Sequence, residues 1–402
     1  MADTSVHDRI TRRRAVQLLG GSLIAGAGLG TAPATARAQT RKPELTRVVL
    51  GQAKAAGQSA QFPLAIANKL FAEQGLDVSM TYFNSGAEMN EALASGSLHV
   101  VATGDVPGIG LMAHRGPAKC IAPLSDFTYD QGMVVRKEIK NPKQLEGAKL
   151  GLTKGTTATM LIELYAQEQR LDIKKIGLVH MSAPEQIPAL ISGDIDGLIC
   201  WEPWLWTATQ KVPGAYVFRR ATNLFKTHNL LVVSDQYATR YPETINAALR
   251  ALLRANELVQ TAEGRRQAAK LVHDNEVPAV PEDELVRMIE KRTFTMAIDQ
   301  SLVDALQTMT DFLHSVGKIN RKPEVREWLA TRFMREVRPD LVTVGFSHHG
   351  GSRLYRHPTL PALAPQGRGS RPADGRRMPP RAGCVRPRSA RSSSPACARP
   401  PA

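Results

Sequence analysis

Short apolar runs alternate with amphipathic stretches between residue 46 and about residue 233 of this chain. The runs have the length and the bounding residues of strands, as in "RVVLGQ", "LDVSMTYF", "LHVVATG", "AKCIAPL", "GMVVRK", "AKLGLT", "IGLVHM", "IDGLIC", "AYVFRR" and "LLVVSD". Helical spacing predicts helices over 62–74, 86–95, 157–170 and 183–192. This alternation predicts an α/β architecture with mainly parallel sheets. From about 242 to 338 the pattern is helical throughout, with boundaries at Pro242, Pro278, Pro281 and Pro323.

Two stretches that lie 97 residues apart share one pattern. They are "NSGAEMNEALASGSLHVVATGDVP" (84–107) and "MSAPEQIPALISGDIDGLICWEPW" (181–204). In each, a serine caps a helix with a glutamate three residues on, and a glycine ends the helix. The strand that follows ends at an acid, which is Asp105 in one copy and Glu202 in the other. The repeat therefore predicts two similar lobes, each with one strand–helix–strand unit.

Helix N-termini are the candidate binding elements in such a pair of lobes. Ligands of open α/β sheets bind beyond the carboxyl ends of the strands, where the free N–H groups of helices favour an anion. The candidates are Ser85-Gly86 in one lobe and the turn "KGTTAT" (154–159) in the other, in which Thr156 and Thr157 also offer hydroxyls. Each cap alone needs no ligand, so the prediction depends on their convergence on one cleft.

The positive charge of the chain lies at its ends. The net charge is +15, but residues 351–402 hold eleven arginines and one acid, and residues 1–38 hold five arginines and two acids. The body between them is nearly neutral, which gives no reason to expect nucleic acid as a partner. Cys120 and Cys200 lie in apolar stretches with no metal-ligand spacing, so we expect two buried thiols, no metal and no cofactor.

The N-terminal stretch predicts export. "TRRRAVQLLGGSLIAGAGLG" is an arginine cluster before a short apolar run, and Ala36-Arg37-Ala38 offers an A-x-A cleavage site. Residues 1–38 are therefore expected to be a signal peptide of the twin-arginine kind, and the mature protein is expected in the periplasm. The Arg- and Pro-rich stretch 347–402 has no hydrophobic period and is expected to be a disordered tail.

Several motifs in order resemble a known family. "FAEQGLDVSM", "TGDVP" after a strand, "KGTTAT" opening a helix and "ISGDIDGLICWEPW" are similar to those of the periplasmic substrate-binding proteins of ABC importers, in the group that binds aliphatic sulfonates, taurine or nitrate. The resemblance implies a type II periplasmic-binding-protein fold, with lobe 1 at 46–130 plus 235–340 and lobe 2 at 136–230. It places the two hinge strands near 131–136 and 229–234. It also implies a monomer that delivers its ligand to a membrane permease.

The resemblance also implies which residues contact the ligand. These are Gln58, Ser59, Gln61, Ser85, Gly86, Thr103, Gly104, Asp105, Thr156, Thr157, Trp201, Glu202 and His228. The loop "AKAAGQSAQFP" departs from that of the sulfonate binders, to which the other motifs are most similar. A fixed negative charge would oppose an anion, so we expect Asp105 and Glu202 to face away, to pair with a cation, or to meet an amino group such as that of taurine.

Three of the four tryptophans surround Glu202, which leaves other ligands open. Trp201, Trp204 and Glu202 could hold a cation or stack on an aromatic or pyrimidine ring. The offset of 97 places Trp201 opposite Gly104, so we predict that Trp201 walls the pocket and that Trp204 and Trp206 support it. An exported enzyme is a third reading, but there is no G-x-S-x-G or H-E-x-x-H motif, and we expect no catalysis.

Overall fold

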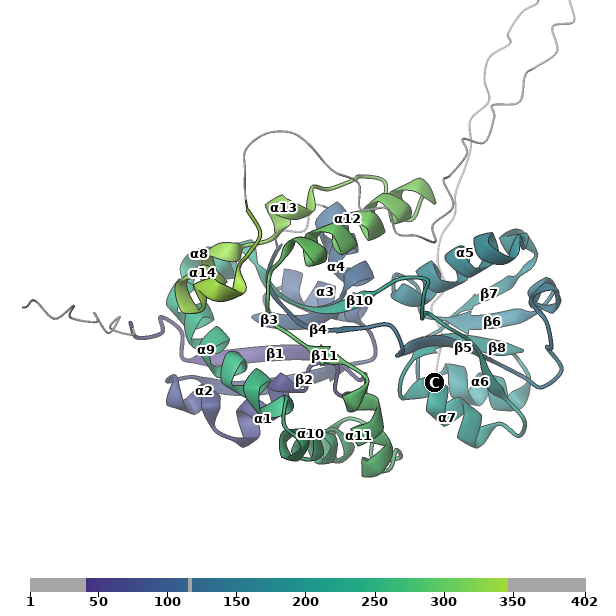
Figure 1. The fold of residues 1–402 in the computed structure, drawn as a ribbon, viewed down its shortest axis with the longest axis horizontal. Coiled ribbons are helices and arrows are strands. Elements are labelled where there is room, and N and C mark those ends of the chain that lie inside the picture. The colour runs from purple at the N-terminus through teal and green to yellow at the C-terminus, as the bar shows by residue number, and fades with distance from the viewer. Residues whose placement is uncertain (1–40, 115–117, 346–402) are drawn as a thin grey trace, which may run out of the picture. The chain divides into compact units, whose positions relative to one another are not determined.

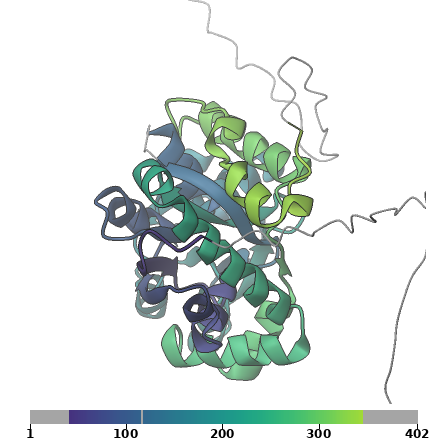
Figure 2. The ribbon, with the colours of Figure 1, turned by 90° about the vertical axis from the view of Figure 1, so that its left-hand side faces the viewer.

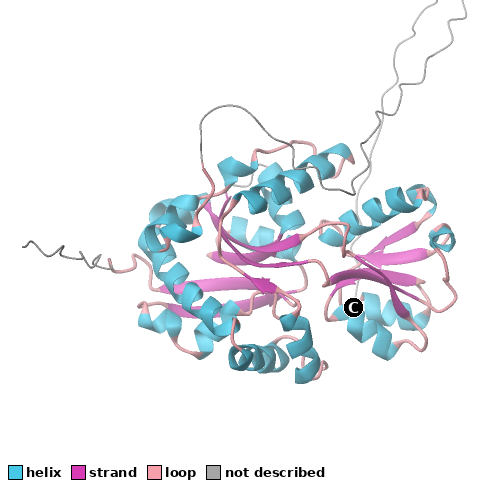
Figure 3. Cartoon of the chain, in the orientation of Figure 1, coloured by secondary structure: helices cyan, strands magenta, loops and turns pink. Residues whose placement is uncertain are grey.

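The strands of this protein form two sheets in the computed structural model, which describes residues 41–114 and 118–345 (Figure 1, Figure 3). Sheet A has the strand order β2-β1-β3-β10-β4-β11, and sheet B has the order β7-β6-β8-β5-β9. Sheet A consists of β1 (Arg47–Ala53), β2 (Asp77–Phe83), β3 (Val100–Gly104), β4 (Ala118–Phe127), β10 (Thr227–Ser234) and β11 (Thr293–Phe294). Sheet B consists of β5 (Gln131–Val135), β6 (Lys149–Leu152), β7 (Gly177–His180), β8 (Gly197–Trp201) and β9 (Tyr216–Arg220).

Helices cover both sheets, which confirms the predicted α/β class. The prediction of mainly parallel sheets is wrong, because five of the nine strand pairs of the described residues are antiparallel, all of them formed by β4, β5 and β10 where the chain passes between the sheets. On sheet B, α5 (Thr157–Gln169) lies on one face, and α6 (Gln186–Ser192) and α7 (Trp204–Lys211) lie on the other (Figure 1). The other α-helices belong to the part of the structure that contains sheet A. They are α1 (Gln61–Ala67), α2 (Leu70–Glu73), α3 (Gly86–Ala94), α4 (Asp105–Ala113), α8 (Asp235–Arg240), α9 (Pro242–Val259), α10 (Ala262–Asn275), α11 (Glu282–Glu290), α12 (Gln300–Ser315), α13 (Val325–Trp328) and α14 (Thr331–Val337).

The region from 242 to 338 is helical as predicted, apart from the two-residue strand β11. Its longest helix, α9, begins at Pro242, whose missing N–H costs nothing at a first helical position. Ile245, Leu249 and Leu252 recur at helical spacing and are buried. Through this apolar face α9 contacts α1, α2 and α14, so elements from both ends of the described chain lie together (Figure 2).

The two sheets repeat one topology, as the offset of 97 residues predicts. In sheet A, β1 pairs in parallel with β2 and β3, and in sheet B, β6 pairs in parallel with β7 and β8. An antiparallel strand then follows on the far side of the third strand, β10 next to β3 and β5 next to β8. The strands β3 and β8 end at Gly104 and Trp201, and these two residues are 97 positions apart.

The helix caps of the two units differ from the prediction in one place. Ser85 caps α3 by accepting a hydrogen bond from the N–H of Glu88, as expected. In the second unit the N–H and the hydroxyl of Ser182 both donate to Glu185 at 2.7 Å, but α6 begins only at Gln186 and has no side-chain cap. Because the Glu185 carboxylate holds the donors of Ser182, this pair closes a turn before the helix instead of capping it.

The strands that were expected at the hinge lie inside the sheets. All pairing of β5 is within sheet B, and all pairing of β10 is within sheet A. The chain therefore crosses between the sheets just before these strands, at 128–130 and at 221–226. Within the described residues, sheet B takes only strands from 131–220 and sheet A only strands outside that range. A division into two lobes agrees with this arrangement, but β10 of sheet A begins at Thr227, inside the range 136–230 expected for lobe 2, so the lobe boundaries stay a prediction.

Two predictions fall on residues that the structure does not describe. The expected signal peptide at 1–38 and the expected tail at 347–402 both lie outside the described ranges. Within those ranges, no helix combines the length and the apolar character that crossing a membrane requires. Cys120 and Cys200 are buried free thiols, as predicted.

Candidate functional site

A small cavity lies where strand ends of both sheets meet. Its volume is about 40 Å³. It is lined by Ala53, Ala55, Gln58, Gly86, Gly104, Pro107, Phe127, Gln131, Thr156, Thr157, Trp201 and Thr227. Three of these residues are the last ones of the parallel strands β1, β3 and β8, which is where open α/β sheets bind ligands. None of the described residues that line the small cavity carries a charged side chain.

Three helix N-termini converge on this small cavity. The helices α3 and α5 begin at Gly86 and Thr157, and α4 begins directly after Gly104. The first N–H groups of a helix have no partner within it, and the helix dipole adds positive potential at that end. Gly86 cannot be replaced without a clash, because a Cβ there would lie 2.5 Å from Oγ1 of Thr103. The small cavity thus offers neutral donors of the kind that hold an anion.

Hydrogen bonds to residues of sheet A anchor the loop before α1. The hydroxyl of Ser125 donates to the carbonyl of Gln58 at 2.8 Å, and the amide of Asn229 donates to the hydroxyl of Ser59 at 2.6 Å. Gln61 donates to the carbonyl of Leu124 at 2.6 Å. Among the three residues predicted from this loop, Gln58 therefore lines the small cavity, whereas Ser59 and Gln61 anchor the loop to sheet A.

The two acids at the strand ends are buried, and each has a partner on a strand of the sheet that it follows. Asp105 accepts hydrogen bonds from the backbone N–H of His228 at 2.9 Å and faces the ring Nδ1 at 3.3 Å. Glu202 forms an ion pair with Arg220 at 2.8 Å and accepts the N–H of Trp206 at 3.0 Å. Burial raises the pKa of both carboxyls, while His228 and Arg220 act in the opposite direction. Neither acid nor His228 lines the small cavity.

Trp201 spans the space between the two sheets. Its side chain lines the small cavity, and its indole N–H donates to the carbonyl of Lys54, which follows β1 of sheet A, at 3.2 Å. Trp204 and Trp206 belong to α7 and are not among the lining residues. With Glu202 held by Arg220, a cage formed by Trp201, Trp204 and Glu202 has no support from this arrangement.

Six of the thirteen predicted residues line the small cavity, and seven do not. The six are Gln58, Gly86, Gly104, Thr156, Thr157 and Trp201. Besides the residues already described, Ser85 caps α3, and Thr103 lies behind Gly86. Gln131, Thr227 and Phe127 line the small cavity and were not predicted. The sequence signal that could have indicated Gln131 and Thr227 is a polar residue at the start of an apolar run, in "QGMVV" and "THNLLVV".

The hydroxyls of the "KGTTAT" turn already have protein partners. Thr156 donates to the carbonyl of Thr153 at 2.7 Å and accepts the N–H of Ala158, and Thr157 donates to Oε1 of Gln131 at 2.8 Å. The side chain of Gln131 thereby keeps its amide group as a donor. We infer that this turn offers a ligand backbone N–H groups more than free hydroxyls.

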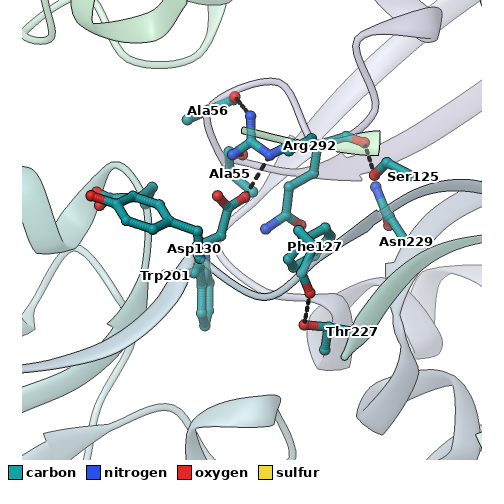
Figure 4. A network of polar contacts seen from close by, with 12 residues as sticks. Ala55, Ala56, Ser125, Phe127, Asp130, Trp201, Thr227, Asn229 and Arg292 are labelled. Carbon is teal, nitrogen blue, oxygen red and sulfur yellow. Dashed lines mark hydrogen bonds and ion pairs between the residues drawn. The ribbon is translucent and has the colours of Figure 1, made fainter. Parts of the chain in front are cut away.

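A buried ion pair adjoins the small cavity, at the crossing 128–130 (Figure 4). The Nε of Arg292 lies 2.5 Å from the carboxylate of Asp130, and both side chains are fully buried. The other guanidinium nitrogens donate to the carbonyls of Ala55 and Ala56, at 3.3 and 2.5 Å. Ala56 has a φ of 47°, a left-handed conformation that a residue with a Cβ rarely adopts. Arg292 therefore fixes the loop that brings Ala55 and Gln58 to the small cavity.

The described residues include one group with possible metal-ligand atoms close together. Atoms of His273, Asp274 and Glu282 lie within 4.8 Å of one another. Lys270 already pairs with Asp274 at 3.0 Å and lies 4.0 Å from Glu282, and Nδ1 of His273 lies 2.9 Å from the carbonyl of Val280. The group is half-exposed and apart from the small cavity, so we assign it no role.

Similar proteins share the fold and the sequence pattern. A putative binding protein of Brucella abortus is 24% identical over 191 residues, 47% of this chain, and this chain spans only 59% of that relative. The taurine-binding periplasmic protein of Escherichia coli is 23% identical over 290 residues, 68% of this chain and 88% of the relative. The structure of the alkanesulfonate-binding protein SsuA from Xanthomonas axonopodis pv. citri matches with a TM-score of 0.63 at 18% identity, over 71% of this chain and 98% of the other.

The last likeness shows the fold, which is that of a periplasmic binding protein, as expected. A match to a family model shows more than the fold. The model of the NMT1-like family matches residues 41–273, which is more than half of the sequence and includes both sheets except for β11. This chain belongs to the NMT1-like family.

Proposed function

We propose that this protein is the exported solute-binding component of an ABC importer. It binds a small anion such as an aliphatic sulfonate, taurine or nitrate in the small cavity and delivers it to a permease in the inner membrane. The observation that carries the proposal is the convergence of three helix N-termini on a cavity lined by uncharged residues. The relatives named for binding taurine and alkanesulfonates support the same ligand class.

The electrostatics of the site favour an anion, although the site itself contributes no fixed positive charge. Helix N-termini each contribute roughly half a unit of positive charge, which acts strongly where water is excluded. The nearby carboxylates of Asp105 and Glu202 would repel an anion, but Asp105 accepts the backbone N–H of His228 and Glu202 is paired with Arg220, so each acid is held by a partner of its own sheet. The protein is a binder and not an enzyme in this proposal, because none of the described residues that line the small cavity is an Asp, Glu, His, Lys, Cys or Ser.

A thermal-shift screen of the purified protein tests the proposed function. We expect taurine, ethanesulfonate or nitrate to raise the melting temperature, because a ligand at 100 times its dissociation constant adds about 2.7 kcal/mol to the free energy of unfolding. Choline and pyrimidines serve as the comparison set. A shift with choline alone, or with pyrimidines alone, would contradict an anion site, and turnover of a bound ligand would contradict a pure binding role.

Trp201→Ala should weaken ligand binding far more than Trp206→Ala. Trp201 lines the small cavity and bonds to the opposite side of it, whereas Trp206 is not a lining residue. Loss of a buried aromatic contact at a binding site typically costs about 2 kcal/mol, or roughly 30-fold in affinity. Isothermal titration with the best anion from the screen measures both variants. Equal losses of affinity would show that Trp201 has no special place in the site.

A further inference from the structure

An ion pair joins the part of the protein that contains sheet A to the part that contains sheet B. The ammonium group of Lys318 lies 2.9 Å from the carboxylate of Glu163. Lys318 follows α12, which packs on α4, and Glu163 belongs to α5, which packs on β5 and β8 (Figure 1). Among the ion pairs within 41–114 and 118–345, it is the one that connects the two parts directly. We call it the Lys318–Glu163 pair.

The end of α12 holds Lys318 in place. Gly317 has a φ of 71° and ends the helix, and the N–H of Lys318 donates to the carbonyl of Leu313 at 2.9 Å, as in a Schellman motif. The next residue, Ile319, is 5% exposed. Arg321 then donates to the last two carbonyls of α4. The backbone of Lys318 is therefore fixed to the sheet A part, and only its long side chain extends towards α5.

Glu163 lies on the helix whose first residue lines the small cavity. That residue is Thr157, and Glu163 follows in the second turn of α5. Thr159, one turn before Glu163, and Lys318 both line a second cavity of about 650 Å³, so the Lys318–Glu163 pair lies at the border of that space. The helix α5 thus faces the sheet A part in two places, through its N-terminus at the small cavity and through Glu163.

Two short connections, at 128–130 and at 221–226, attach the sheet B part to the rest of the described chain. Such connections allow one part to turn against the other as a rigid unit. A turn that moves α5 away from α12 would separate Lys318 from Glu163, and it would also widen the small cavity, because both parts line that cavity. The Lys318–Glu163 pair and an anion in the small cavity therefore favour the same closed arrangement, and each strengthens the other.

We propose that the Lys318–Glu163 pair is an electrostatic latch, which keeps the two parts closed around the bound anion and slows its release. The side chain of Glu163 is 14% exposed and that of Lys318 is 39% exposed, so dissolved salt reaches the pair and weakens it. Release of the ligand should therefore become faster as the ionic strength rises. This inference rests on the proposed function, because it takes the anion from that proposal and adds a control on how long the anion stays bound.

Release rates of the purified full chain test the latch. Stopped-flow displacement of the best anion from the thermal-shift screen, followed by tryptophan fluorescence, measures the dissociation rate constant. Glu163→Gln and Lys318→Met should each raise this constant by about two- to fivefold, the range expected for a partly exposed ion pair. The association rate constant should stay nearly unchanged, because the pair forms only once the two parts have closed. Raising the salt from about 20 mM to about 500 mM should accelerate release from the natural protein by a similar factor, and much less from either variant.

Two further variants make the result specific. Glu163→Lys combined with Lys318→Glu restores opposite charges and should return the dissociation rate constant to within about twofold of the natural value. Lys143→Met is the control and should release the anion at the natural rate, because Lys143 forms its ion pair with Glu146 at 2.7 Å inside the sheet B part. Unchanged release in both single variants, or no recovery in the exchanged variant, would overturn the latch and leave the proposed function intact. Failure of every anion to bind the natural protein would instead overturn the proposed function.

Discussion

Arg292→Met should lower the free energy of unfolding by about 3–5 kcal/mol, which is the typical result of breaking one side of a buried ion pair. The side chains of Arg292 and Asp130 are both fully buried and lie 2.5 Å apart. Methionine fills a similar volume but leaves the carboxylate of Asp130 without its counter-ion. It also leaves the carbonyls of Ala55 and Ala56 without donors. Urea denaturation followed by circular dichroism measures the change.

Two variants separate the buried charge from other effects of Arg292→Met. The double variant Asp130→Asn with Arg292→Met removes both charges, so it should recover part of the lost stability. Arg287→Met is the matched surface control, because Arg287 is about half-exposed and pairs with Asp283 and Glu284 on its own helix. Such exposed pairs contribute up to about 1 kcal/mol. Similar losses for Arg292→Met and Arg287→Met would contradict the structural role assigned to the buried pair.

Arg292→Met should also disturb the loop that lines the small cavity. Arg292 holds the loop that presents Gln58 to the small cavity, and Asp130 is the last residue of the connection into sheet B. Tyr129, the neighbour of Asp130, lies between two cations, with Cζ of Arg220 at 3.9 Å and Nζ of Lys291 at 3.7 Å from its ring centre. One set of contacts thus connects the crossing between the sheets with the loop that lines the site.

The fold of this chain was readable from its sequence because its signals are local. The strand runs, the helix cap at Ser85 and the offset of 97 residues each depend on neighbours within one unit. They predicted where β3 and β8 end and therefore where the cavity lies. The same signals predicted Gly86 and Thr157, which line the small cavity because helices begin there.

The rest of the site could not be predicted because its contacts are distant in sequence. Whether Asp105 faces the ligand depends on His228, which is 123 positions away, and Asp130 meets Arg292 at a separation of 162. No periodic pattern carries that information. The sequence left open whether Asp105 and Glu202 face away, pair with a cation or meet an amino group of the ligand. Their partners decide it, since a buried carboxylate needs a counter-charge or a donor.

Burial of another acid, Glu276, makes the stability of this protein depend on pH. Glu276 is 4% exposed and accepts hydrogen bonds from the amide of Gln52 at 2.6 Å and from the N–H of Ala55 at 3.4 Å. Burial raises the pKa of Glu276 from 4.5 to about 7, against the opposing effects of those hydrogen bonds and of Arg292. The pKa of the nearby phenol of Tyr82 is raised as well, mainly by burial and in addition by the charge of Glu276.

Glu276→Gln should therefore stabilise the protein above pH 7 and have little effect near pH 5. Between pH 4.5 and about 7 the folded state binds more protons at this residue than the unfolded state, so the stability of the natural protein falls as the pH rises through this range. The shift corresponds to about 3 kcal/mol at pH 8. The glutamine carboxamide keeps an acceptor for Gln52 and carries no charge at any of these pH values.

Urea denaturation at pH 5, 6, 7 and 8 measures this difference directly. The gap between Glu276→Gln and the natural protein should widen from under about 1 kcal/mol at pH 5 to about 3 kcal/mol at pH 8. Glu290→Gln, at an exposed position at the end of α11, is the control and should follow the natural protein at every pH. A gap that stays constant with pH would contradict this prediction. It would mean that the pKa of Glu276 is the same in the folded and the unfolded chain.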